Sequence, residues 1–74
     1  MKENIKITEL SDGTILKKLD GKYHCIGGPA IKWPGKFGKE FFHLYGVHYS
    51  KSDYAQELVN RGLMTENERF VFML

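Results

Sequence analysis

The fold is decided by a stretch near the start of the chain, Thr14-Ile15-Leu16-Lys17-Lys18-Leu19-Asp20-Gly21-Lys22-Tyr23-His24-Cys25-Ile26. Its central Asp-Gly pair supplies the positive φ angles of a type I′ turn, so the stretch predicts a β-hairpin with strands over Thr14–Leu19 and Lys22–Ile26. A second Asp-Gly pair, Asp12-Gly13, places another turn after Ile5–Leu10. We therefore expect a meander of three strands, the third ended by Gly27-Gly28-Pro29.

Short strands continue beyond this meander. Ala30–Trp33 predicts a strand that Pro34-Gly35 stops, and a basic loop follows over residues 36–39. Glu40–Leu44 and Val47–Tyr49 then form a last small hairpin around the tight turn expected at Tyr45-Gly46.

The C-terminal third has helical signals. Ser50 or Ser52 can cap a helix over Asp53–Arg61, and Gly62 suits the left-handed position that ends it. Thr65-Glu66-Asn67-Glu68 has the spacing of a capping box, which predicts a second helix to Phe72 or beyond, while a terminal strand through Phe70-Val71-Phe72 competes. The prediction is an α+β domain with a small antiparallel meander of about five short strands and a C-terminal helix or helical hairpin. It is a single domain over 1–74, with the sheet in 1–49 and the helices in 50–74.

Composition limits the environment and the partners. The 74 residues include one cysteine, so no internal disulfide can form and a reducing, cytoplasmic location is expected. The longest apolar run is Phe70–Leu74, which predicts neither export nor a membrane span. Ten aromatic side chains can fill a small core, and forming a homodimer would bury more of them.

Charge is distributed unevenly along the chain. The net charge is +2, which is too small to require a nucleic-acid partner. Residues 1–39 hold eight lysines against four acids, and residues 40–74 hold three basic residues against five acids, which gives about +4 and −2. The predicted sheet is therefore basic and the predicted helical part slightly acidic.

Catalytic and metal-binding patterns are weak. His24, Cys25, His43 and His48 are the residue types of a metal or thiol site. However, His24 and Cys25 are adjacent on a predicted strand and so point to opposite faces, and the sequence contains no Cys-x-x-Cys or His-x-x-x-His pair. We expect a buried structural thiol, partly exposed imidazoles, no catalytic residue, no metal and no cofactor. Gly27-Gly28-Pro29 lacks the Lys-Ser/Thr of a phosphate-binding loop, which leaves a turn.

The surface that looks most functional combines lysines with rings on which bases or a partner could pack. The candidate partner-binding residues are Lys17, Lys18, Lys22, Tyr23, Lys32, Trp33, Lys36, Phe37 and Lys39. The alternation of Ile31, Lys32 and Trp33 favours Trp33 in the core instead. The lysines of the first hairpin could equally be solvated positions or could protect a sheet edge from aggregation. Because that hairpin carries apolar groups on both sides, one sheet face could meet a protein partner or a second copy.

Two segments resemble known families. Leu19-Asp20-Gly21-Lys22-Tyr23-His24 and Gly28-Pro29-Ala30-Ile31 resemble the Leu-(Asn/Asp)-Gly-Lys-x-His…Gly-Pro-Ala-Ile hairpin repeats, related to MORN-type repeats, of many phage and giant-virus proteins. Tyr45-Gly46-Val47-His48-Tyr49 resembles a degenerate second copy, with Tyr45 where Asn or Asp is usual and Val47 where Lys is usual.

The segment Leu58–Glu68 is similar to the helix–Arg-Gly-Leu-Ile-Thr–helix hairpins that end many bacterial and phage domains. Together the resemblances imply a bacteriophage accessory protein, a class that includes anti-CRISPR proteins and other inhibitors of host defence or transcription. The leading hypothesis is binding and inhibition of a host protein in the host cytoplasm. A small basic nucleic-acid-binding module is the alternative, and a metal- or thiol-dependent enzyme is the most remote one.

Overall fold

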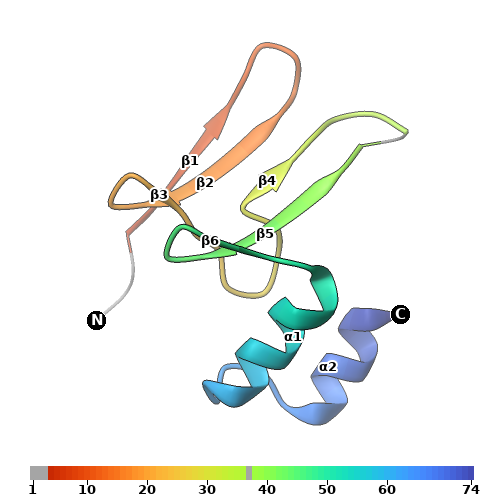
Figure 1. The fold of residues 1–74 in the computed structure, drawn as a ribbon. Helices are drawn as coiled ribbons and strands as arrows, with labels where there is room; N and C mark the ends of the chain where they lie inside the picture. Colours follow the sequence, from red (N-terminus) through yellow and green to blue (C-terminus); the bar gives the residue numbers. More distant parts are fainter. Residues whose placement is uncertain (1–3, 37) are drawn as a thin grey trace.

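A computed structural model describes residues 4–36 and 38–74 of the chain. It contains one antiparallel sheet followed by two helices, which confirms the predicted α+β class (Figure 1). The strands are β1 (Ile5–Glu9), β2 (Ile15–Leu19), β3 (Lys22–Tyr23), β4 (Ile31–Lys32), β5 (Glu40–Leu44) and β6 (Val47–Tyr49). The helices are α1 (Lys51–Asn60) and α2 (Glu66–Met73).

Two of the predicted turns have the expected backbone. Asp20 and Gly21 have φ angles of 49° and 80°, and Tyr45 and Gly46 have 50° and 87°, so both pairs adopt the positive φ of a type I′ turn. The turn after β1 is longer. It is closed by a hydrogen bond that the Leu10 amide donates to the Thr14 carbonyl, at 2.8 Å.

The third strand is shorter than predicted. β3 pairs with the end of β2 only through Lys22 and Tyr23, and the predicted continuation to Ile26 is wrong. The reason lies at the start of β2, where Leu16 pairs with Ile31 of β4. Since β4 occupies the edge that β3 would need, the chain leaves the sheet after His24, and the strand order is β1-β2-β4-β5-β6.

α2 begins at its predicted cap, Thr65, and α1 begins after Ser50, one of the two predicted caps, two residues before the predicted start at Asp53. The Ser50 side chain accepts a hydrogen bond from the Asp53 amide at 3.2 Å, and Thr65 and Glu68 form a complete capping box. Gly62 has a φ of 72° after the end of α1. Residues 66–73 are therefore helical, and the competing terminal strand is wrong.

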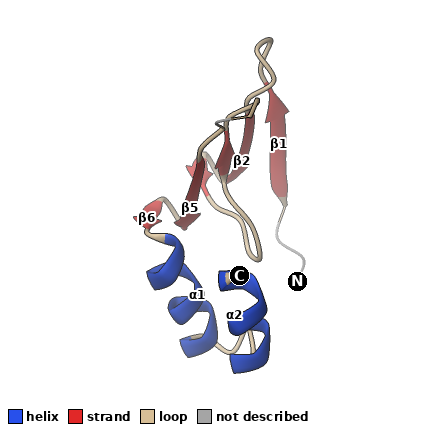
Figure 2. Cartoon of the chain, turned by 90° about the vertical axis from the view of Figure 1, so that its right-hand side faces the viewer, coloured by secondary structure: helices blue, strands red, loops and turns tan. Residues whose placement is uncertain are grey.

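The core lies between one end of the sheet and the helices. Phe42 and Leu44 of β5 pack on Tyr54 and Leu58 of α1, with Phe72 of α2 against them. The ring centroids of Phe42 and Tyr54 are 4.9 Å apart, an aromatic contact within the favourable range. Seen from the side, the helices lie below β5 and β6, while β1 and β2 extend away from them (Figure 2).

Candidate functional site

The two faces of the sheet differ because residues alternate along each strand. Phe42 and Leu44 point toward the helices, so Phe41 and His43 point to the opposite side, which we call the open face. Cross-strand pairing extends this face across the sheet, since directly opposed residues share a side. By that register it comprises Lys6, Thr8, Leu16, Lys18, Tyr23, Ile31, Phe41, His43 and His48, with Trp33 and Lys39 continuing it beyond the strand ends.

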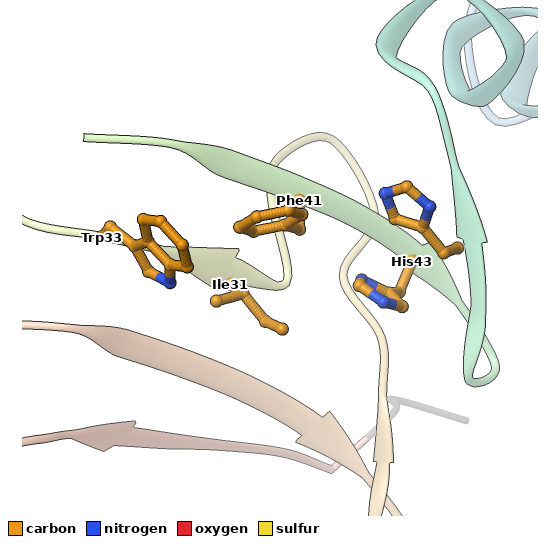
Figure 3. Close-up of a pocket in the computed structure, with 5 residues that line it drawn as sticks. Ile31, Trp33, Phe41 and His43 are labelled. Carbon is orange, nitrogen blue, oxygen red and sulfur yellow. The ribbon is translucent and has the colours of Figure 1, made fainter. Parts of the chain in front are cut away.

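Rings form the centre of the open face. Ile31, Trp33, Phe41, His43 and His48 line a hollow of ≈ 380 Å³ (Figure 3). The ring centroids of Trp33 and Phe41 lie 5.3 Å apart in an edge-to-face arrangement, and those of Tyr23 and His43 lie 5.4 Å apart. Trp33 and His48 are exposed and the other rings half-buried, so this is a partly exposed aromatic surface that neither helix covers.

The charges on the open face are all positive. The Lys18 Nζ lies 4.9 Å from the centroid of Tyr23, and the Lys39 Nζ lies 5.8 Å from that of Trp33. The two acids in the described strands, Glu9 and Glu40, alternate onto the other side of the sheet. The face thus offers flat rings flanked by cations.

The structure divides the predicted partner-binding set. Lys18, Tyr23, Trp33 and Lys39 lie together on the open face. The register places Lys17, Lys22 and Lys32 on the side of the sheet that carries the helices. Lys36 lies in the exposed loop between β4 and β5, and Phe37 lies outside the described residues.

The prediction that Trp33 belongs to the core is wrong, because its side chain is 44% exposed. Trp33 follows β4 directly, and alternation from Ile31 sends it to the face that lacks a helix. Its amide donates to the Lys39 carbonyl at 2.9 Å, which closes the loop between β4 and β5.

His24 and Cys25 also differ from expectation. His24 is fully buried instead of partly exposed, and its Nδ1 accepts a hydrogen bond from the Tyr45 amide at 3.0 Å. Cys25 is half-buried, because it follows the residue at which the chain leaves the sheet, so the expected buried thiol is wrong. His24 therefore ties the two type I′ hairpins together.

Sequence reasoning did not assign Phe41, His43 and His48 to the site. His43 is half-buried and His48 exposed, and their ring centroids are 5.1 Å apart. Burial lowers the pKa of His43, as does the nearby His48, while the Phe41 carbonyl acts in the opposite direction. The signal that could have found this pair was the predicted Tyr45-Gly46 turn, which sets His43 opposite His48.

A second apolar surface lies on α2. Phe70, Val71 and Leu74 are 68%, 66% and 86% exposed. A hollow of ≈ 500 Å³ beside them is lined by Gly27, Leu63, Met64, Asn67, Glu68, Val71 and Phe72. So much exposed apolar area on one small domain is typical of a protein that binds a partner.

Comparisons with protein-family models, with curated proteins and with solved structures gave no match. Within residues 4–36 and 38–74, no helix has the length and apolar character needed to cross a bilayer. Across the same residues, no three His, Cys, Asp or Glu side chains gather closely enough to hold a metal ion between them.

Proposed function

We propose that this chain is a phage-type accessory protein that acts by binding in the host cytoplasm, and that it inhibits or modulates a host protein by covering its functional surface. The observation that supports this proposal is the open face, where Trp33, Phe41 and Tyr23 are gathered on a sheet side without a helix. Tryptophan and tyrosine are the residues that contribute most often to binding energy at protein interfaces. Lys18 and Lys39 beside the rings favour an acidic partner surface.

The test is capture of partners from a bacterial lysate by the tagged protein, after nuclease treatment and at high salt. We expect one host protein to be retained by the wild type and lost by Trp33→Ala. Phe70→Ser is the control, because it changes an aromatic residue on α2 that is still more exposed, 68% against 44% for Trp33. Loss of the partner in Phe70→Ser but not in Trp33→Ala would move the interface to α2 and contradict the proposal.

Two further experiments test the proposal, one for an enzymatic activity of the chain and one for its self-association. The proposal fails if the purified chain alone modifies a nucleic acid, a nucleotide or a peptide. Sedimentation equilibrium checks for a homodimer. A dimer that Trp33→Ala converts to a monomer would show that the open face is occupied by a second copy and is not free for a host protein.

Single-stranded nucleic acid is a second candidate ligand, and the absence of strand carboxylates from the open face favours it. Bases can stack on exposed rings while lysines pair with phosphates. Fluorescence anisotropy with a labelled oligothymidine should then show affinity that falls steeply with salt. Lys39→Ala should weaken binding, whereas Lys32→Ala, on the other side of the sheet, should not. Equal effects of the two changes, or binding insensitive to salt, would rule out this interface.

A further inference from the structure

His43 and His48 face each other directly across the last hairpin. They are opposed in the register of β5 and β6, one pair back from the Leu44–Val47 pair that closes the turn. The pair that closes a two-residue turn is hydrogen-bonded, so the next pair is of the non-hydrogen-bonded kind, in which side chains lie closest. The hairpin therefore holds two imidazoles side by side on the open face.

Their separation matches that of two imidazoles on one metal ion. A zinc ion lies about 2.0–2.1 Å from each coordinating nitrogen, which puts it about 3.2 Å from each ring centre. Two such rings have centres about 4.5 Å apart at a right angle and about 5.2 Å apart at the tetrahedral angle. The ring centroids of His43 and His48 are 5.1 Å apart, which falls within this range, and their planes are inclined at 53°.

The surroundings leave these rings available as ligands. The Nδ1 of His43 is buried, and no hydrogen bond of normal geometry reaches it within the described residues, although the Phe41 carbonyl lies near the ring. A buried polar atom without a partner is uncommon in a native structure and calls for an explanation. The walls of the hollow, Ile31, Trp33 and Phe41, offer no oxygen or sulfur side-chain atom that would compete for the ion.

We propose that His43 and His48 together bind one divalent transition-metal ion of the zinc, nickel or copper class, which imidazole prefers. The described chain adds no third His, Cys, Asp or Glu to this pair. The remaining coordination positions are therefore open to water, and the ion exchanges readily. This proposal is independent of the partner that the open face binds.

The test is isothermal titration of Zn²⁺ and of Ni²⁺ into the full chain, purified without a histidine tag. We expect one ion per chain. Replacing either ligand, in His48→Gln or His43→Gln, should weaken binding by more than the ~10–100-fold that loss of a group supporting a metal ligand costs. Cys25→Ser is the control for the chain's one thiol and should bind like the wild type.

Two results would overturn the proposal. One is that the wild type takes up neither ion, and the other is that His48→Gln binds as tightly as the wild type. His48 is exposed, so its replacement leaves the core intact even if His43→Gln fails to fold. Two-dimensional NMR of the imidazole groups provides an independent readout, because the signals of both His43 and His48 should shift on titration while those of His24 stay in place.

Discussion

Replacing Tyr54 with phenylalanine removes one oxygen atom and disconnects α1 from the loop that follows β3. The Tyr54 hydroxyl accepts a hydrogen bond from the Gly27 amide at 3.0 Å. It also donates toward the carbonyl oxygens of Gly28, at 3.1 Å, and Cys25. The side chain is fully buried, so the new phenyl ring fits the same space while the loop loses its partner.

The expected cost follows from the hydrogen bonds lost. Each contributes about 0.5–1.5 kcal/mol net, and a buried group left without a partner costs about 1–3 kcal/mol. Because Gly27 is exposed, its amide can form a hydrogen bond with water in the variant. We therefore expect a total loss of stability near the middle of these ranges, about 2 kcal/mol. A domain of this size has a free energy of unfolding of about 4–11 kcal/mol, so the change removes a large part of it. The corresponding fall in Tm is about 8–16 °C.

Thermal and urea unfolding followed by circular dichroism measures this cost. Tyr49→Phe is the matched control, because Tyr49 also packs on the core but its hydroxyl makes no hydrogen bond within the described residues. We expect the control to lose less than about 0.5 kcal/mol. Equal losses in the two variants would refute the idea that the Tyr54 hydroxyl anchors the loop.

Three further outcomes are expected. Thr65→Ala breaks the capping box of α2 and should cost about 0.5–2 kcal/mol, with reduced helical signal; an unchanged urea midpoint would contradict this. Gly38→Ala would drive a Cβ into the Trp33 carbonyl oxygen, so the fluorescence of the chain's one tryptophan should change; an identical spectrum would show that the loop adapts freely. Burial raises the pKa of Tyr54 above its unfolded value near 10, so the unfolded state loses this proton first. The contribution of Tyr54 to stability should therefore be constant below about pH 10 and be lost as the pH rises further, so the fall in stability above about pH 10 should be smaller in Tyr54→Phe.

Local chemistry in the sequence determined where the chain turns and where its helices begin. Asp20-Gly21 is a pair that tolerates two positive φ angles, which fixes a hairpin whatever lies around it. The side chains of Thr65 and Glu68 accept hydrogen bonds from each other's backbone amides, so this cap can be predicted without knowledge of the rest of the molecule. These features depend on residues a few positions apart, and for that reason the succession of strands and helices along the chain could be predicted, though not the order of the strands in the sheet.

Tertiary structure alone decided how long the strands are and which side chains are buried. β4 pairs with the part of the β2 edge that a longer β3 would need. This pairing shortens β3 and leaves Cys25 outside the sheet. Trp33 is exposed because the helices cover only one side and one end of the sheet, which alternation along a strand does not reveal. His24 is buried because the chain leaves the sheet there and packs on the β5–β6 turn, with its ring centroid 4.2 Å from that of Tyr45. The open face exists for the same reason: the pairing of strands gathers its rings, and the placement of α1 and α2 on the opposite side leaves them uncovered.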